Sequence, residues 1–324
     1  MFYTAEHVNR YASGELDMEE LIYFSESRLT LQFEMLLSEI HVADVNCTES
    51  LTDIVLVTGP SSSGKTTFSN LLAEKLTEDG YNCTVLSLDN YYHDRSYLER
   101  KSIEAGRIPK DKLDLDFECI EAFDTDRFHA DMVSYLEGNE VQLPEYDFTT
   151  GTSHLSSKYL KPTKKDMIIV EGIQSLNPLL IDGIDFHRVF RVYICPFDYY
   201  MGSHHGETVS ITPKHIRFMR RAIRDNAHRN SPLPVTMGMW SGVREGEEKY
   251  IKPMKKYADF FFNSSFEYEI SYLKYKITEL METLDEEEML KFKRIIAPEN
   301  LKPFIGVPKL YIPRKSIFRE FYQG

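Results

Sequence analysis

The sequence has no long apolar run and few cysteines. No stretch approaches the roughly 18 consecutive apolar residues of a membrane-spanning helix, and the first residues carry several acids instead of an apolar signal segment. The four cysteines, Cys47, Cys83, Cys119 and Cys195, form no C-x-x-C pair, so neither a zinc site nor a disulfide framework is indicated. We therefore expect a cytoplasmic protein whose cysteines are buried, reduced thiols.

Negative charge outweighs positive charge, since 51 Asp and Glu residues stand against 38 Lys and Arg residues and the formal net charge is -13. An acidic chain is repelled by nucleic acid and by anionic membrane surfaces. We therefore expect a small-molecule substrate, with neither nucleic acid nor membrane as a partner; a homo-oligomer stays possible. With 324 residues, of which 42% are hydrophobic, the chain is long enough to bury a sizeable core.

One segment fits a phosphate-binding pattern at every fixed position. Gly59–Thr66 reads G-x-x-x-x-G-K-T, between the apolar, strand-like Ile54–Val57 and a stretch with helical apolar spacing at Phe68–Leu76. The glycines let backbone N–H groups point at a phosphate, while the start of the following helix adds its positive dipole end. Lys65 would reach the outer phosphates and Thr66 would ligate Mg²⁺. The predicted nucleotide-binding residues here are Gly59, Pro60, Ser61, Ser62, Ser63, Gly64, Lys65, Thr66 and Thr67.

Strand-like and helical stretches alternate from Asp53 onward, which predicts βαβ units. We expect an α/β fold of the P-loop NTPase class, with a mainly parallel sheet and helices on both faces. The predicted strands are Ile54–Val57, Thr84–Leu88, Met167–Val170, Val189–Ile194 and Phe260–Phe262.

The remaining segments are expected to extend this unit. Residues 1–50 read as a helical N-terminal extension, and residues 51–284 as the P-loop domain that binds the nucleotide. Within that domain, about 94–162 read as an insertion that covers the substrate and about 204–232 as a lid. Residues 285–324 read as a C-terminal helix followed by an extended, proline-containing tail.

Two acids follow predicted strands at the edge where ligands bind in open α/β sheets. Asp89 ends one strand and Glu171 another. A hydroxyl that attacks a γ-phosphate needs a carboxylate to take its proton, and Mg²⁺ needs oxygen ligands. We therefore predict Asp89 as the catalytic base, and Thr66, Glu171 and also Asp89 as candidate metal ligands. The alternative is that both are ordinary turn acids.

A basic cluster stands out in this acidic chain. Arg217, Arg221 and Arg224 share one face of a helix predicted to begin after Pro213. Such a face can neutralise a triphosphate and the transferred phosphoryl group. We expect Lys65, Arg221 and Arg224 to be catalytic, and Arg220 and Arg229 to bind nucleotide. The alternative is a solvated basic helix.

A third set combines aromatic rings with acids. Its candidate substrate-binding residues are Tyr92, Phe117, Glu118, Tyr146 and Phe148. Aromatic faces stack on nucleobases, and carboxylates accept hydrogen bonds from ribose hydroxyls. The alternative is that the rings belong to the core.

In this order, the motifs resemble the uridine kinase and phosphoribulokinase family of P-loop kinases, and most closely a bacterial subgroup of nucleoside kinases. The matching segments are Gly59–Thr67, Leu88–Tyr92, Leu143–Phe148, Ile169–Ile173, Arg220–Asp225 and Tyr257–Asp259, with further similarity in Trp240–Lys249 and Ser316–Phe321.

The resemblance implies transfer of phosphate from ATP or GTP, with Mg²⁺, to the 5'-hydroxyl of a nucleoside such as uridine or cytidine. It also implies Asp89 as base, Thr66 and Glu171 at Mg²⁺, and Arg221, Arg224 and Arg229 in the lid. Phe117, Tyr146 and Phe148 would then flank the nucleobase, and Tyr92 would help to hold the nucleoside.

The chain departs from the family pattern at three positions that bear on the acceptor. Glu118 stands in place of a ribose-holding Asp, Gly151 in place of a base-reading His, and Met239 in place of a ribose-contacting Gln. Two alternatives therefore stay open: a kinase for another hydroxyl acceptor, such as a sugar phosphate, and a nucleotide-binding regulatory module without turnover.

Overall fold

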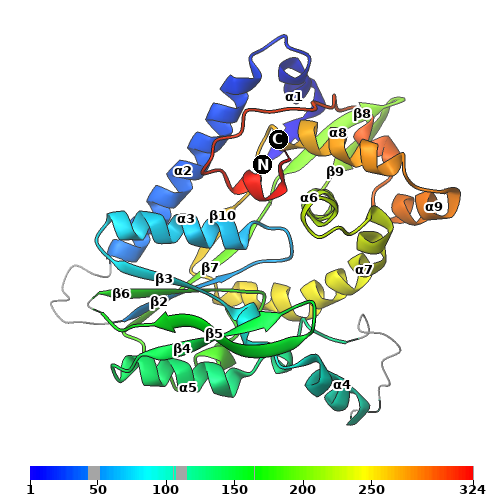
Figure 1. The fold of residues 1–324 in the computed structure, drawn as a ribbon. Coiled ribbons are helices and arrows are strands. Elements are labelled where there is room, and N and C mark those ends of the chain that lie inside the picture. The colour runs from blue at the N-terminus through cyan, green and yellow to red at the C-terminus, as the bar shows by residue number, and fades with distance from the viewer. Residues whose placement is uncertain (43–51, 105, 107–114, 164, 324) are drawn as a thin grey trace.

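A five-stranded parallel sheet forms the centre of the molecule (Figure 1). The computed structural model describes residues 1–42, 52–104, 106, 115–163 and 165–323. The strand order is β10-β7-β2-β6-β3. Each of the five predicted strands overlaps one strand of this sheet, which confirms the α/β fold with a mainly parallel sheet. The strands are β2 (Asp53–Thr58), β3 (Asn82–Ser87), β6 (Asp166–Glu171), β7 (Arg188–Cys195) and β10 (Phe260–Asn263).

Both faces of the sheet are covered, because successive side chains of a strand point to opposite faces. On one face, Val55 and Val57 pack in the same core as α3 (Lys65–Glu78) and α2 (Met18–Val42). On the other face, Ile54 and Leu56 pack in a second core, which is completed by α5 and a β-hairpin (Figure 1). These are α5 (Thr125–Leu136), β4 (Val141–Asp147) and β5 (Thr152–Leu160).

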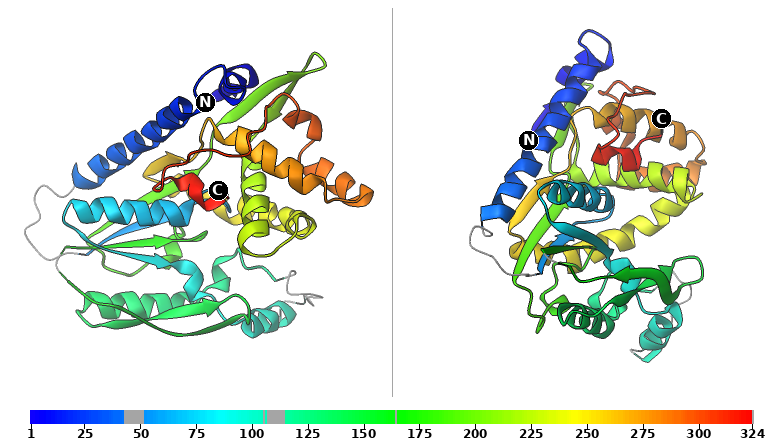
Figure 2. Two further views of the ribbon diagram at one scale, coloured as in Figure 1. Left: turned by 45° about the horizontal axis from the view of Figure 1, so that its top comes forward. Right: turned by 60° about the vertical axis from the view of Figure 1, so that its left-hand side comes forward.

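A helical layer lies beyond the carboxyl edge of the sheet (Figures 1 and 2). Its helix α6 begins at Pro213, as the sequence predicts, and proline at this first position is favourable because its missing N–H has no partner there anyway. Asp285 caps α9 by accepting a hydrogen bond from the Glu288 N–H. The helices are α6 (Pro213–His228), α7 (Leu233–Gly246), α8 (Glu269–Met281) and α9 (Glu286–Ile295); α4 (Arg95–Glu104) lies in the 94–162 segment.

The two ends of the chain pack onto the same side of the molecule. Phe33 of α2 stacks on Phe68 of α3 with ring centroids 5.2 Å apart, and it also contacts Phe262 of β10. Near the other end, Ile317 and Phe318 are buried in a 3₁₀ helix that spans Ile317–Phe321. The sequence predicts an extended tail and gives no sign of this turn.

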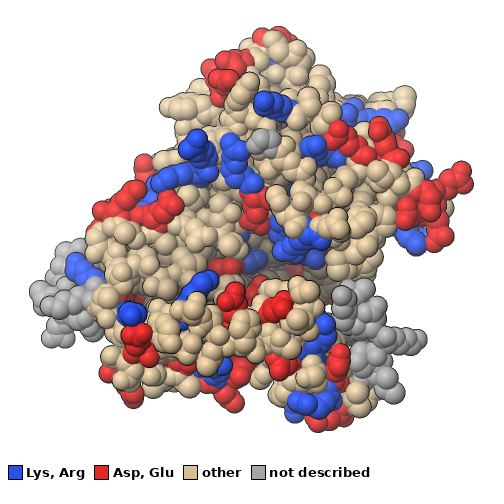
Figure 3. Space-filling view, in the orientation of Figure 1, with Lys and Arg blue, Asp and Glu red and all other residues tan. Residues whose placement is uncertain are grey.

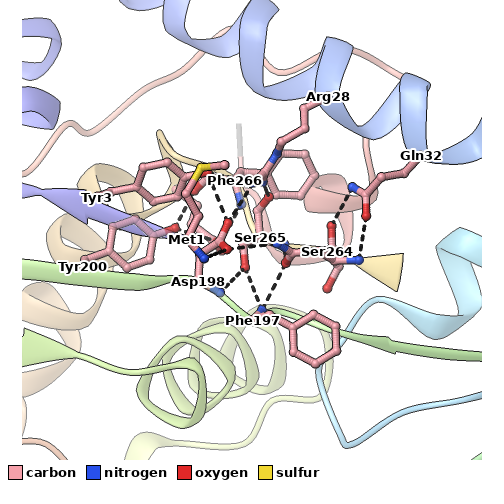
Figure 4. A network of polar contacts seen from close by, with 12 residues as sticks. Met1, Tyr3, Arg28, Gln32, Phe197, Asp198, Tyr200, Ser264, Ser265 and Phe266 are labelled. Carbon is pink, nitrogen blue, oxygen red and sulfur yellow. Dashed lines mark hydrogen bonds and ion pairs between the residues drawn. The ribbon is translucent and has the colours of Figure 1, made fainter. Parts of the chain in front are cut away.

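The N-terminal segment is also held by a buried acid, Asp198 (Figure 4). Its carboxylate accepts hydrogen bonds from the Met1 amine at 2.9 Å, from Arg28 at 2.8 Å and from the Tyr3 hydroxyl at 3.1 Å. The side-chain amide of Asn263 donates a fourth, at 2.9 Å. These contacts connect β1 (Phe2–Thr4) to the ends of β7 and β10. Strand β1 also pairs with β8 (Tyr199–His204), and β8 forms a hairpin with β9 (Glu207–Ile211). The short helix α1 (Ala5–Ala12) follows β1.

Two expectations from composition can be compared with the structure. Within the described ranges, no helix is both long and apolar enough to cross a membrane. Cys195 is a buried free thiol, but the free thiols of Cys83 and Cys119 are only partly buried, because both lie where the sheet or the insertion meets solvent. The expectation of buried cysteines is thus wrong for these two, and Cys47 lies outside the described residues.

Candidate active site

Three strands of the sheet end at one level. In the pairing register, Glu171 of β6 lies opposite Val57 of β2 on one side and Ser87 of β3 on the other. The phosphate loop therefore begins two residues beyond this level, at Gly59, and Asp89 lies two residues beyond it on the neighbouring strand. The structure thus brings the loop and both acids to one edge of the sheet, where ligands of open α/β folds bind.

The phosphate loop adopts a shape that its glycines permit. A Cβ atom at Gly59 would lie 2.0 Å from the Ile194 carbonyl oxygen, so no larger residue fits there. Gly64 has a φ of 92°, in the left-handed region that favours glycine, and precedes α3. The hydroxyl groups of Ser62 and Ser63 are buried and have no hydrogen-bond partner among the described residues. Polar atoms that are buried but unsatisfied in the protein fit a loop that holds a polar ligand.

Two side chains from the start of α3 face the same space. The Lys65 ammonium donates to the carbonyl oxygens of Gly59 at 2.9 Å and Pro60 at 3.4 Å, so it is folded back on its own loop. The Thr66 hydroxyl donates to Glu171 Oε1 at 3.2 Å. Thr66 and Glu171 thus present two oxygen donors side by side, beside the lysine.

Three carboxyl groups share this environment and affect one another. Burial is the main cause that raises the pKa of Asp89, while Lys65 and Arg229 act in the opposite direction. Burial, and then the charge of Asp89, raise the pKa of Glu171 to about 7. Burial also raises the pKa of Glu118 to about 7, against the effects of Lys65 and Arg221. These carboxylates need cations beside them in order to hold their charges near neutral pH.

The arginines of α6 supply part of this positive charge. Arg221 donates to the Ser61 hydroxyl of the phosphate loop at 2.7 Å. The buried Asp225 pairs with Arg221 at 3.2 Å, with Arg224 at 3.1 Å and with Arg229 at 3.5 Å. One acid therefore orders three cations and leaves a positive excess next to the loop. In Figure 3, acidic and basic side chains meet in the recess that crosses the middle of the face shown.

Two other arginines of this helix point inward. Arg217 donates to the Ser61 carbonyl at 3.2 Å and pairs with Glu247 at 2.5 Å. The Arg220 side chain is fully enclosed: it donates at 2.7 Å both to Glu269 and to the Ser264 carbonyl, and its guanidinium lies over the Phe321 ring. The expectation that Arg220 binds nucleotide does not fit this position, because its charge is already balanced inside the protein.

The expected aromatic residues lie together. Tyr92 contacts the rings of Phe117, Tyr146 and Phe148, with centroids 5.7, 5.4 and 6.2 Å away. Tyr92 and Tyr146 are buried, whereas Phe148 is 63% exposed. The Tyr92 hydroxyl donates to the Phe117 carbonyl at 3.0 Å, but the buried Tyr146 hydroxyl has no hydrogen-bond partner among the described residues. The rings pack edge-to-face or tilted against one another and form an apolar cluster that contains one unpaired hydroxyl group.

Arg95, which no sequence motif singles out, borders this aromatic group. Its guanidinium donates to the Phe148 carbonyl at 3.3 Å, and its backbone N–H donates to the Gly151 carbonyl at 2.8 Å. A Cβ atom at Gly151 would lie 2.6 Å from Arg95 Cζ. Glycine at position 151 therefore makes room for the arginine, and this departure from the family pattern was the signal that could have pointed to it.

The sequence also gave no role to Glu320. Its Oε2 accepts a hydrogen bond from the Thr67 hydroxyl at 3.3 Å, and its Oε1 pairs with Arg224 at 3.2 Å. Next to it, the Ile317 side chain occupies the space in which a Cβ atom at Gly64 would lie. The C-terminal segment thus forms a wall of the phosphate loop.

A phosphate loop between a buried parallel strand and a helix, with acids at the ends of neighbouring strands, defines a P-loop nucleotide-binding protein. The chain belongs to the phosphoribulokinase and uridine kinase family, whose model matches residues 54–196. It is 29% identical to a uridine kinase of Staphylococcus haemolyticus and 30% identical to one of Staphylococcus aureus, in each case over 64% of this chain and 86% of the relative.

Solved structures of similar fold include a possible uridine kinase from Bacillus stearothermophilus. Its sequence is 20% identical to this one. The superposition covers 100% of that chain and 73% of this chain, with a TM-score of 0.43. A putative fructose transport system kinase from Silicibacter is 16% identical, with 97% of it and 70% of this chain covered and a TM-score of 0.48. Membership of the family makes the protein a kinase, for which ATP is the implied phosphoryl donor.

Proposed function

We propose that the protein transfers the γ-phosphoryl group of ATP to the 5'-hydroxyl of a pyrimidine nucleoside, uridine or cytidine. The observation that carries this proposal is the position of Asp89. Asp89 interacts electrostatically both with Lys65 of the phosphate loop, which opposes the rise of its pKa on burial, and with Tyr92 of the aromatic group, whose pKa is raised by burial and then by Asp89. A carboxylate that interacts both with a phosphate loop and with an aromatic cluster is suited to an acceptor that combines a hydroxyl with a ring.

The acceptor would lie against the aromatic group. Tyr92, Phe117, Tyr146 and Phe148 offer ring faces and edges for a base, and the buried Tyr146 hydroxyl has no partner among the described residues that would compete with the base for it. Glu118, on the phosphate-loop side of this group, offers a carboxylate for the sugar hydroxyls. The relatives named uridine kinase, of which this chain spans 86%, support a pyrimidine as the base.

The chemistry follows from these positions. The acceptor oxygen attacks the γ-phosphorus, its proton passes to a carboxylate oxygen of Asp89, and the bond between the γ-phosphorus and the β–γ bridging oxygen breaks to release ADP. Burial raises the pKa of Asp89, which makes it a stronger base than an exposed aspartate. Lys65, Arg221, Arg224 and Arg229 would hold the phosphates and balance the charge that spreads over the transferred group.

A magnesium ion fits the donors that are present. Thr66 and Glu171 provide neighbouring oxygens, and the described residues contain no group of three or more His, Cys, Asp or Glu that could hold a metal alone. Mg²⁺ in kinases is held by one or two protein oxygens together with substrate phosphates and water. Thr66 and Glu171 would hold the ion, which would offset the charge of the phosphates. Asp89 would then remain available to accept the proton of the acceptor.

Arg95 supports a second candidate acceptor, a sugar phosphate. Its guanidinium borders the aromatic group, and its Nε is buried without a hydrogen-bond partner among the described residues. An arginine fork can hold a phosphate on the acceptor as well as the edge of a base. The aromatic rings favour the nucleoside, because a sugar phosphate offers them no flat face.

The two candidates are separated by one assay. ADP release with Mg-ATP is followed for a panel of ribonucleosides, deoxyribonucleosides and sugar phosphates, and then for the Arg95→Ala variant with the best acceptor. We expect uridine or cytidine to give the highest kcat/KM. Turnover with a sugar phosphate alone, abolished in Arg95→Ala, would establish the second candidate. ATP binding without turnover on any acceptor would refute a kinase for either class.

A further inference from the structure

A second hollow with a basic lining lies away from the phosphate loop, between α6, α7 and α9. Its volume is about 630 Å³, within the range of pockets that hold small molecules. Figure 1 shows these three helices next to one another, on the side opposite α2. No residue of the phosphate loop and none of the aromatic group lines this hollow. It is therefore a separate place in the fold, for which neither the family nor the proposed reaction gives a use.

The lining is strongly cationic although the chain as a whole is acidic. Its charged groups are Lys214, Arg244, Lys291 and Arg294, with a single carboxylate, Glu288. That carboxylate is engaged, because it accepts a hydrogen bond from the backbone N–H of Asp285 at the start of α9. Glu247, Glu248 and Glu287 pair with Arg244 and Lys291 from outside the lining, so the positive charge available to an anion is mainly that of Lys214 and Arg294.

The cations are only partly used by the protein itself. Lys214 and Arg294 form no ion pair with any residue that the structure describes. Lys291 pairs with Glu287 at 2.8 Å, but both side chains are mostly exposed, and such pairs contribute little. Only Arg244 is engaged more firmly, with Glu247 and with Glu248. Guanidinium and ammonium groups held around a cavity with spare donors are suited to phosphate oxygens.

One buried ring also lines the cavity. Trp240 is 6% exposed, and the guanidinium of Arg217 lies 5.8 Å from its centroid. Trp240 is the only tryptophan of the sequence. Any ligand in this pocket changes the surroundings of a single, unambiguous fluorophore.

We propose that the pocket between α6, α7 and α9 binds a small anion with two or more phosphate groups, at a site distinct from the phosphate loop. The four cations contact the phosphates, and the volume leaves room for an organic group attached to them. This inference goes beyond the proposed kinase reaction and does not depend on it, because binding here requires neither Asp89 nor an acceptor.

Pyrophosphate and tripolyphosphate are the probes, titrated at constant ionic strength while the emission of Trp240 is recorded. The Lys65→Ala variant serves as the background, because it weakens binding of the same probes at the phosphate loop. We expect a saturable change of emission that persists in this background. A change that disappears with Lys65→Ala would mean that the fluorophore reports the phosphate loop, and would overturn the proposal.

Two neighbouring residues of α9 give a matched comparison. Arg294→Glu reverses a charge in the pocket, whereas Lys293→Glu makes the same change on an exposed residue that does not line it. We expect Arg294→Glu to raise the dissociation constant tenfold or more, and Lys293→Glu to change it less than twofold. Lys214→Gln should weaken binding as well. Because Lys214 lies on α6, this variant shows that the loss of binding does not come from a distortion of α9 alone. Equal effects of the two α9 variants, or no saturable binding at all, would refute the site.

Discussion

Glu320 pairs with Arg224 at 3.2 Å although the two residues come from distant parts of the chain. The same carboxylate accepts a hydrogen bond from Thr67, the residue that follows the phosphate-loop motif. An acid of the C-terminal segment is thus held against two groups that we propose to contact the nucleotide. A triphosphate that enters the loop has to compete with this carboxylate for the arginine.

Replacement of Glu320 by Gln should therefore strengthen ATP binding. The amide keeps the size of the side chain and an acceptor for Thr67, but it removes one of the two anionic partners of Arg224 and leaves Asp225 as the other. We expect the KM for ATP to fall about threefold, consistent with a partly buried pair of modest strength, and kcat to stay within twofold. Steady-state kinetics at varied ATP measure this. Glu299→Gln, an exposed acid of the same segment, is the control, and a rise in KM would show that Glu320 positions Arg224 instead.

Asp89→Asn should abolish turnover but leave nucleotide binding intact. The amide cannot accept the proton of the acceptor hydroxyl, and loss of a general base costs about 10²- to 10⁴-fold in rate. Turnover is measured by ADP release and ATP binding by calorimetry. Asp182→Asn, an exposed aspartate outside the site, should behave as the unaltered protein. Unchanged turnover in Asp89→Asn would remove this residue from the mechanism.

Glu171 should make the stability of the ligand-free protein depend on pH. Its pKa is raised to about 7 in the folded state, so the protonated form is favoured on folding. This contribution is fully present below the unfolded pKa and is lost as the pH rises through about 7. Glu171→Gln resembles the protonated acid, and at pH 8 it should raise the free energy of unfolding by up to about 3 kcal/mol.

At pH 5 most of the difference between Glu171→Gln and the unaltered protein should disappear. Denaturant unfolding at both values measures it, without Mg²⁺ or nucleotide. The exposed Glu145→Gln provides the comparison and should change little at either pH. An equal effect of Glu171→Gln at pH 5 and pH 8 would contradict the raised pKa.

The unpaired hydroxyl of Tyr146 allows binding to be separated from folding. Because this buried hydroxyl has no partner among the described residues, Tyr146→Phe should raise the free energy of unfolding by about 1 kcal/mol, while the KM for the acceptor rises severalfold. Tyr135→Phe is the contrast: its hydroxyl donates to Asp166, so the change should destabilise the protein by about 1–3 kcal/mol with an unchanged KM. A constant KM in Tyr146→Phe would exclude contact with the acceptor.

The central sheet could be predicted from the sequence because its strands are short, mostly apolar runs that alternate with helical stretches, a pattern typical of a parallel α/β sheet. Helix α6 could be predicted from Pro213 and the spacing of its arginines. The β4–β5 hairpin could not, because its strands are half exposed and carry a mixed polar pattern. Periodicity also placed Arg220 on the helix without showing that Glu269 encloses its charge.

For the candidate site, local motifs were sufficient where the function is carried by one segment, as in the phosphate loop. They failed where the contact joins distant segments. Thr67 and Glu320 are separated by 253 positions, and nothing in the local sequence of either residue specifies the other. The orientation of Arg95 likewise depends on the left-handed turn at Gly151, which has a φ of 75°, and only the folded chain shows that the two meet.

One hydrophobic core contains Tyr3 and Leu36 from the start of the chain, Val55 and Phe68 beside the phosphate loop, and Phe318 from its last residues. The two flanking segments are therefore not accessories that could be trimmed without harm. The packing of the phosphate loop thus depends on segments that lie outside the phosphate-binding motif. A substitution in either flanking segment can therefore alter catalysis.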